Sequence, residues 1–375
     1  MNFDFTVSKS ISSLKPYKTG KPISEVQREY GITEVVKLAS NENPLGPSPM
    51  AIEKIKEHLS NVNRYPDPSC FELIAAVEKK WKVKKEQIAI GNGSNEVIDL
   101  LIRILCEPGD KILTCESAFI AYQICAQAAR VQTQFVPLLP GFKVDLEQTA
   151  RILELDPNIK IVFLPNPNNP TGTYINDESV RKFLNTVSKR KNLVVVFDEA
   201  YTEFVRAKDY RPAIDYLSQY PQVASIRTLS KAYGLAGLRI GILLANSTII
   251  DWFNRVRNPF NVNDLAQAAA IGGLQDEEFV SKSKTLNWQG LDYFYSEFKK
   301  MGLSYVESQA NFVMFDTKRD VVKVNEELLK KGIILRPILN YGFKSHLRIS
   351  VGLPAENERA MQALKQILPE IDEMK

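Results

Sequence analysis

Short runs of apolar, mostly β-branched residues recur along the chain, separated by longer segments of mixed polarity. The runs cover residues 87–90, 111–114, 160–164, 193–197, 224–227 and 239–244. After the first run, apolar side chains fall at the spacing of one helix face: Val97, Leu100, Leu101, Ile104 and Leu105. Buried strands that alternate with amphipathic helices predict an α/β fold, with helices on both faces of a mostly parallel sheet.

The pattern of apolar and polar residues changes near residues 258–259. Beyond them, a long charged segment at 276–301 is followed by two strand-like runs at 311–315 and 346–351. We therefore expect a large domain over residues 44–262 and a small C-terminal domain over 263–375, sizes that suit a chain of 375 residues. Residues 1–43 contain Pro, Lys and Ser in abundance and are predicted to form an arm that contributes to the small domain.

Composition narrows the classes of function. The 48 basic and 44 acidic residues are scattered, which argues against nucleic-acid or membrane-surface binding. Cys70, Cys106, Cys115 and Cys125 lack metal-ligand spacing, so we expect reduced thiols and no metal site. The chain shows no signal-peptide pattern and no apolar run of about 18 residues. These features predict a cytoplasmic enzyme or binding module that acts on small molecules.

One glycine-rich loop has the features of an anion site. Residues 91–95 read Gly-Asn-Gly-Ser-Asn, follow a predicted strand and open a predicted helix. Free backbone N–H groups and the helix dipole would favour an anion beside Ser94 and Asn95. A dinucleotide fingerprint would need a third glycine, which this loop lacks. An ordinary tight turn is the alternative.

Polar residues also follow two other predicted strands. Three prolines within residues 164–172 stiffen a loop from which Asn169 projects, although such turns also occur without any ligand. Asp198 ends the most apolar run, where a carboxylate is costly unless it meets a positive group. Tyr201, three residues further on, would face the same ligand. For Asp198 the alternative is a plain helix N-cap.

The segment 227–239 carries the strongest chemical signal. Lys231 follows a strand among small and apolar residues, with the hydroxyls of Thr228 and Ser230 before it and Arg239 eight residues after it. A lysine in such surroundings loses its proton near neutrality and becomes a nucleophile towards a carbonyl. The hydroxyls and Arg239 are suited to a phosphate. Taken alone, Lys231 also fits a solvated surface lysine.

Together these motifs resemble those of the fold type I pyridoxal-phosphate aminotransferases. The order Asn-Pro-Thr-Gly at 169–172, Asp-x-x-Tyr at 198–201, Ser-Lys at 230–231 and Arg239 is highly specific. Within that family the chain is most similar to the histidinol-phosphate branch, at residues 14–17, 40–44, 63–66, 258–263 and 347–350. The resemblance covers nearly the whole chain. It implies a seven-stranded, mostly parallel sheet in the large domain, a smaller α+β domain and a homodimer.

The resemblance also implies roles for the residues already singled out. Lys231 would bind pyridoxal 5'-phosphate covalently and move a proton of the amino donor. Asp198 would keep the pyridine nitrogen protonated, and Tyr201 and Asn169 would bond the ring hydroxyl. Phe119 stands where relatives often carry a tyrosine stacked on the ring. The phosphate contacts would be Ser94, Asn95, Thr228, Ser230 and Arg239, with Tyr65 reaching in from the second subunit.

Substrate recognition is expected on the other side of the site. Arg348 resembles the arginine that grips the anionic end of the substrate, and Arg336 resembles a second arginine of the histidinol-phosphate branch, although an exposed arginine needs no such role. Tyr17 and Asn43 complete the predicted substrate contacts. His58 and His346, the two histidines, match no catalytic position.

The predicted reaction is transamination of L-histidinol phosphate with 2-oxoglutarate, which gives imidazole acetol phosphate and glutamate. Three alternatives share the scaffold: an aromatic amino acid aminotransferase, a threonine-phosphate decarboxylase and a non-catalytic regulator that binds the same cofactor. The regulator is disfavoured because every catalytic position is filled and no DNA-binding helix-turn-helix segment is appended.

Overall fold

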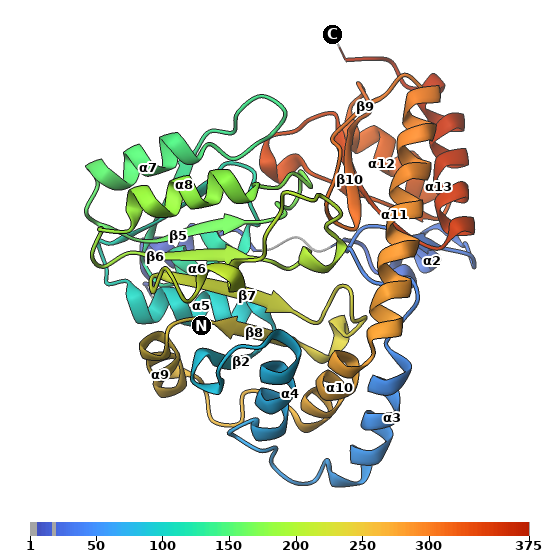
Figure 1. Cartoon of the computed structure of the whole chain (residues 1–375). Coiled ribbons are helices and arrows are strands. Elements are labelled where there is room, and N and C mark those ends of the chain that lie inside the picture. Colours follow the sequence, from blue (N-terminus) through green and yellow to red (C-terminus); the bar gives the residue numbers. More distant parts are fainter. Residues whose placement is uncertain (1–5, 17–19, 375) are drawn as a thin grey trace.

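A computed structural model describes residues 6–16 and 20–374. Tyr17, one of the predicted substrate contacts, lies outside the described residues. The main sheet has seven strands in the order β2-β8-β7-β6-β5-β3-β4 (Figure 1). Their bounds are β2 Ile88–Asn92, β3 Lys111–Cys115, β4 Gln132–Val136, β5 Ile159–Pro165, β6 Val194–Asp198, β7 Val223–Thr228 and β8 Ile240–Leu244. Only β8 runs antiparallel to its neighbours β2 and β7, which confirms the mostly parallel sheet.

Helices cover both faces of this sheet, which explains why its strands are continuously apolar. Successive residues of a strand point to opposite faces, so Val195 and Phe197 enter one core while Val194 and Val196 enter the other. The first core is closed by α4 Phe71–Trp81, α7 Leu146–Leu155, α8 Asp177–Val187 and α10 Asp264–Gln275. The second is closed by α5 Ser94–Leu105, α6 Ala121–Ala128 and α9 Ser247–Val256.

The C-terminal part of the chain builds a second, smaller α+β unit beside the main sheet (Figure 1). Its antiparallel sheet has the order β12-β13-β10-β9. The elements are α11 Glu277–Lys300, β9 Ser304–Tyr305, β10 Phe312–Asp316, α12 Val321–Lys330, β11 Ile333–Ile334, β12 Arg336–Pro337, β13 His346–Ser350 and α13 Pro354–Ile367. A separate core, which includes Phe298, Phe315 and Leu364, holds the unit together.

The boundary between the two units bears on the expected division at residues 262 and 263. Helix α10 follows that point, yet Ala266, Ala269 and Leu274 on it belong to the core of the large sheet. It packs against α4 and against α3 Pro49–His58, at the end of the molecule opposite α12 and α13 (Figure 1). The long helix α11 then runs from α10 to the small unit. The change of core therefore lies within α11.

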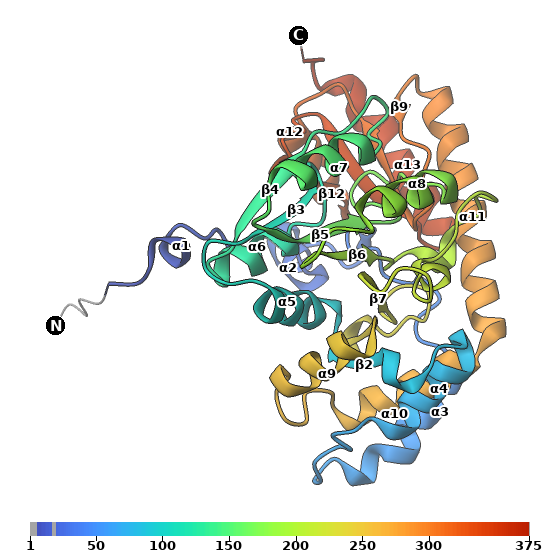
Figure 2. The ribbon, with the colours of Figure 1, turned by 60° about the vertical axis from the view of Figure 1, so that its left-hand side comes forward.

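The N-terminal segment reaches across to the small unit. Its elements before α3 are α1 Lys9–Ser12, α2 Ile23–Tyr30 and β1 Val36–Lys37. Strand β1 pairs in parallel with β11, so residues just before the large domain are fixed to the C-terminal unit. In Figure 2, α1 lies beside α6 at the edge of the molecule, and none of its residues is buried. The arm expected from the sequence thus joins the small unit through β1.

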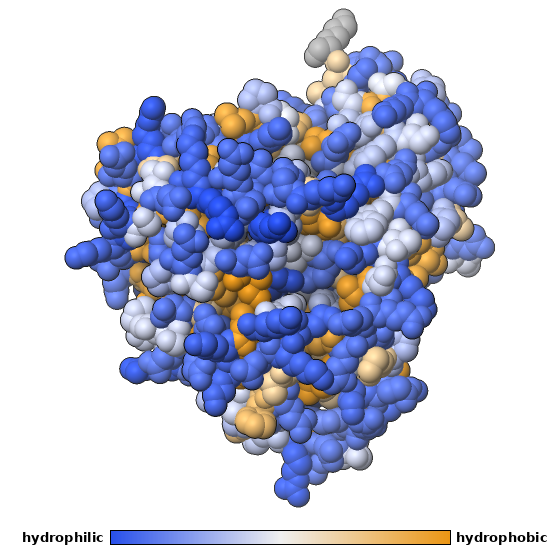
Figure 3. All heavy atoms as spheres, viewed as in Figure 1, coloured by the Kyte–Doolittle hydropathy of each residue, from blue (hydrophilic) through white to orange (hydrophobic). Residues whose placement is uncertain are grey.

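The surface shows no broad apolar band on the face seen in Figure 3, where hydrophobic side chains occur in small groups among hydrophilic ones. Over residues 6–16 and 20–374, no helix is both long and apolar enough to cross a membrane. The same residues contain no cluster of His, Cys, Asp and Glu side chains suited to a metal ion.

Candidate active site

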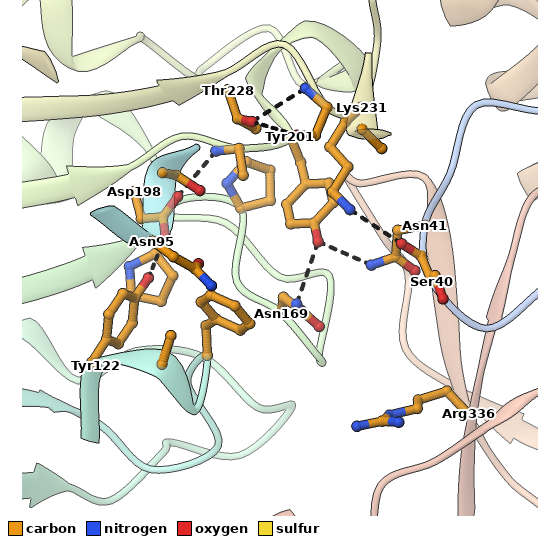
Figure 4. A pocket seen from close by; sticks show the side chains of 18 of the residues that line it. Ser40, Asn41, Asn95, Tyr122, Asn169, Asp198, Tyr201, Thr228, Lys231 and Arg336 are labelled. Carbon is orange, nitrogen blue, oxygen red and sulfur yellow. Dashed lines mark hydrogen bonds between the residues drawn. The ribbon is translucent and has the colours of Figure 1, made fainter. Parts of the chain in front are cut away.

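A cavity of about 380 Å³ lies where the carboxyl ends of β5, β6 and β7 face the small unit. Open α/β sheets bind their ligands at such strand ends. Figure 4 shows Lys231, Tyr201 and Asp198 on one side of the cavity and Arg336 on the other. The predicted residues that line it are Ser94, Asn95, Phe119, Asn169, Asp198, Tyr201, Thr228, Ser230, Lys231, Arg239, Arg336 and Arg348.

Lys231 follows β7 and extends its amine into the cavity. Its Nζ donates a hydrogen bond to the carbonyl oxygen of Ser40 at 3.1 Å (Figure 4). Burial lowers the pKa of this amine to about 8, and the positive charge of Arg348 acts in the same direction. At pH 7 roughly a tenth of Lys231 is then uncharged, far more than of an ordinary lysine with a pKa of 10.5, and the uncharged form is the one that acts as a nucleophile or a base.

Asp198 is the last residue of β6 and is almost fully buried, with 7% of its surface exposed. Its Oδ2 accepts a hydrogen bond from the hydroxyl of Tyr122 at 2.6 Å, and its Oδ1 accepts one from the backbone N–H of Ala200 at 3.2 Å. Burial raises the pKa of this carboxyl to about 6. The next helical turn begins at Thr202 with Tyr201 as its N-cap, so Asp198 caps no helix.

Tyr201 is buried between the two units. Its hydroxyl oxygen accepts a hydrogen bond from the side-chain amide of Asn41 at 2.9 Å and another from that of Asn169 at 3.3 Å (Figure 4). Burial raises the pKa of the phenol to about 12, so it stays protonated at neutral pH. Because both amides donate to its oxygen, the Tyr201 proton is left for an acceptor in the cavity.

An anion cradle lies at the start of α5. Ser94 is the first residue of that helix, where backbone N–H groups and the dipole favour negative charge. Gly93 precedes it with φ 80°, and a Cβ at this position would lie 2.3 Å from Nη2 of Arg239. The positive φ favours glycine at this position, and the guanidinium of Arg239 packs directly against it. Thr228 and Ser230, whose side-chain oxygens are 3.0 Å apart, line the same part of the cavity.

Two arginines face this cradle from the small unit. Arg336 on β12 and Arg348 on β13 are direct partners in the antiparallel register, and both line the cavity. Directly opposed like charges destabilise a sheet. Arg348 is also bonded, through Nη1 to Oδ1 of Asn169 at 2.5 Å and through Nη2 to the carbonyl oxygen of Ala39 at 2.7 Å. The pair gives this wall a strong preference for anions.

The remaining predicted residues lie outside the cavity of this chain. Asn43 donates to the carbonyl of Ala232 and the hydroxyl of Ser283, while Asn41 lines the cavity in its place. Tyr65 is 82% exposed and stacks on Phe260 with ring centroids 4.6 Å apart. The two histidines also lie elsewhere: His58 bonds Asp264, and His346 packs near Phe142 and Phe343.

Two cavity residues escaped the sequence interpretation. Asn41 stood in a motif noted only for its resemblance, without any sign that its side chain would meet Tyr201. Tyr122 lies in the ordinary-looking helix α6, and its only signal was its position three residues after Phe119. The two rings contact edge to face, with centroids 5.9 Å apart.

A lysine with a lowered pKa, a buried carboxylate and an anion cradle at strand ends define a site for a phosphorylated cofactor and an amine. Consistent with this class of site, residues 33–364 match the model of the family "Aminotransferase class I and II", and the chain belongs to that family. Similar proteins indicate the branch of this family to which the chain is most similar. The chain is 54% identical over 367 residues to the histidinol-phosphate aminotransferase of Bdellovibrio bacteriovorus, covering 97% of this chain and 99% of the relative.

Other relatives agree. Histidinol-phosphate aminotransferase 2 of Hydrogenovibrio crunogenus is 45% identical, with 96% of this chain and 95% of the relative covered. Among solved structures, the histidinol-phosphate aminotransferase of Sinorhizobium meliloti in complex with pyridoxal-5'-phosphate matches with a TM-score of 0.87 at 26% identity. That match covers 97% of this chain and 98% of the other. The resemblance read from the sequence motifs is therefore confirmed.

Proposed function

We propose that this chain is a pyridoxal-phosphate-dependent aminotransferase that transfers the amino group of L-histidinol phosphate to 2-oxoglutarate. The products would be imidazole acetol phosphate and glutamate, a step of histidine biosynthesis. Relatives named for this activity support the proposal along almost their whole length. The paired arginines of the small unit are the observation that carries the choice of substrate.

The residues present fit pyridoxal phosphate. A set of hydrogen-bond donors near the start of α5 suits a phosphate: Ser94, Thr228, Ser230 and Arg239. The guanidinium of Arg239 packs against Gly93, where a Cβ would collide with it. The buried carboxylate of Asp198 suits a protonated ring nitrogen, which would offset the cost of its burial. Phe119 also lines the cavity and offers an aromatic ring on which the cofactor ring can stack.

When bound, the cofactor supplies an electron sink that stabilises negative charge at the Cα of the amino donor. Lys231 would hold the cofactor and, once released, take and return the proton at that Cα, a task suited to its pKa of about 8. Asp198 would hold the proton on the ring nitrogen. Tyr201 and Asn169 would hydrogen-bond the ring hydroxyl, and the amide of Asn41 helps to orient the phenol of Tyr201.

The charge of the cavity favours two phosphate groups, one on the cofactor and one on the substrate. Among the described residues that line it, four side chains are cationic, Lys231, Arg239, Arg336 and Arg348, and one is acidic, Asp198. Arg239 lies with the cofactor-phosphate cradle, whereas Arg336 and Arg348 lie on the opposite wall. A single bidentate guanidinium can hold a carboxylate. Two opposed arginines suit a phosphate, which carries up to two negative charges near neutrality.

A panel of amino donors tests the proposal. Purified protein with pyridoxal phosphate and 2-oxoglutarate should give its highest kcat/KM with histidinol phosphate and a lower one with phenylalanine or tyrosine. Threonine phosphate should release no carbon dioxide. A preference for phenylalanine would move the activity to aromatic amino acids, and the absence of any transamination would contradict the family assignment at the level of activity.

We also propose that the enzyme is a homodimer in which Tyr65 contacts the cofactor phosphate of the second subunit. The exposed apolar side chains around α3 and α4 support this, since Val62 is 62% exposed, Tyr65 82% and Phe71 73%. An apolar group of this kind on one end of a molecule marks a contact surface. Sedimentation velocity should give a mass of two chains, and a monomer would contradict the proposal.

A further inference from the structure

The hydroxyl of Tyr122 points at Asp198, the one carboxylate among the described residues that line the cavity. Tyr122 lies on α6 with no exposed surface, and its ring stacks on Phe163 with centroids 4.6 Å apart and planes 7° from parallel. Its hydroxyl lies 2.6 Å from Oδ2 of Asp198 (Figure 4). The stacked ring has no freedom to turn the hydroxyl away, so the contact is built into the packing of α6 on the sheet.

The direction of this hydrogen bond is fixed by the chemistry of its partners. Burial and the neighbouring Asp198 raise the pKa of Tyr122 well above its ordinary value, so the phenol keeps its proton and donates. Asp198 therefore accepts, and a hydrogen bond to a carboxylate stabilises the ionised form. Without such donors a buried carboxyl would become neutral, and a neutral carboxyl cannot hold the proton of a ring nitrogen by charge.

From this geometry we propose that Tyr122 is a positioning residue that keeps Asp198 ionised and aimed at the ring nitrogen of the cofactor. The inference rests on the proposed function. It assigns to α6, a helix that carried no sequence signal, a part in the affinity for the cofactor. Tyr122 acts through Asp198 and needs no contact with the substrate.

The surroundings of Asp198 set the sign of the expected effect. Tyr122 faces it from α6 and Lys231 from the loop after β7, while Glu199 and Tyr201 follow it on its own segment. Tyr122 and Lys231 favour the ionised carboxylate, and Glu199 opposes it. Removing the Tyr122 hydroxyl therefore raises the pKa of Asp198 above its present value of about 6. At neutral pH a larger fraction of the carboxyl is then neutral.

The test compares Tyr122→Phe with Tyr216→Phe. Tyr216 is 1% exposed and donates to Oδ1 of Asp177 at 2.7 Å, away from the cavity, so it controls for the loss of a tyrosine hydroxyl that donates to a carboxylate. Affinity is measured on the cofactor-free full chain for pyridoxal phosphate and for deazapyridoxal phosphate, in which a carbon replaces the ring nitrogen. Tyr122→Phe should lower the affinity for pyridoxal phosphate about ten- to a hundredfold, the range expected for the loss of a hydrogen bond to a charged group.

The analogue separates a role at the ring nitrogen from a loss of packing. Its affinity should be nearly the same in wild type and Tyr122→Phe, and Tyr216→Phe should change neither ligand. In the cofactor-free protein, infrared difference spectra against Asp198→Asn should show Asp198 titrating at higher pH in Tyr122→Phe. Equal weakening of both ligands, or no weakening of either, would overturn the inference while the proposed function stands. A wild type that binds no pyridoxal phosphate would overturn both.

Discussion

The two walls of the cavity differ in how the chain builds them. The large-domain wall, which carries Asp198, Tyr201 and Lys231, comes from short segments that directly follow β6 and β7. The small-domain wall, which carries Arg336 and Arg348, depends on residues 39–41 crossing from the N-terminal segment. There the hydroxyl of Ser350 donates to the amide oxygen of Asn41, 309 residues away in sequence.

This difference separates reaction from recognition. The large-domain wall is anchored in two cores that sandwich a seven-stranded sheet, so its groups are held on rigid strand ends. The small-domain wall is held through β1, β11 and hydrogen bonds between distant segments. We infer that changes in the first wall abolish the reaction with every donor, whereas changes in the second alter which donor is preferred.

The largest effect is expected from Lys231→Ala. Loss of the amine removes both the nucleophile and the base, so turnover should fall by at least about 10⁴-fold with all donors. The covalent link should also be lost, so that borohydride no longer fixes the cofactor to the chain. Exposed Lys189→Ala serves as the control and should retain both. A variant that still carries a cofactor fixed by borohydride would show that another lysine holds it.

A smaller but still large effect is expected from Asp198→Asn, which keeps shape and removes charge. Its turnover should fall roughly 10²- to 10⁴-fold with every donor, the range for breaking a buried charge pair.

Asp198→Asn should also stabilise the cofactor-free protein. The folded pKa of Asp198, about 6, lies above its ordinary 3.8, so the ionised carboxylate opposes folding above pH 6, by roughly 1–3 kcal/mol. This penalty fades as the pH falls from 6 towards 3.8 and both states become protonated. The melting temperature of the variant should therefore exceed that of the wild type at neutral pH, and the gain should shrink in acid. For the reaction itself, unchanged turnover of Asp198→Asn would show that the charge of Asp198 has no role.

The sequence was informative where the chemistry is local. Six strands of the main sheet are continuous apolar runs because both faces are buried, and these were predicted. Strand β4 was not, because Gln132–Val136 lies at the sheet edge with polar, partly exposed residues. Most of the predicted cofactor contacts come from segments that follow predicted strands, and all except Tyr65 line the cavity.

Contacts between distant segments could not be read in the same way. Asn41 meets Tyr201 across 160 residues, and nothing in its neighbourhood distinguishes it from Asn43. Tyr122 resembles any core residue of an amphipathic helix until its distance to Asp198 is known. The place of α10 is equally hard to read from the sequence, because its small, mostly apolar residues do not reveal which of two cores the helix joins.

The smallest effect, and the most selective, is expected from Arg336→Ala on the small-domain wall. Loss of one charge-assisted contact costs about 1.5–3 kcal/mol, so kcat/KM for histidinol phosphate should fall roughly 10- to 150-fold. The kcat/KM for phenylalanine, which offers a single carboxylate, should fall less, because Arg348 on β13, the strand partner of residue 336, is still present to bind that carboxylate. Arg336→Lys keeps the charge without the two parallel donors and should give an intermediate loss. Steady-state kinetics of both donors in the three proteins measure the difference. Equal losses for the two donors would mean that Arg336 contributes only to the overall positive potential of the cavity. The substrate phosphate would then have to be recognised by other residues.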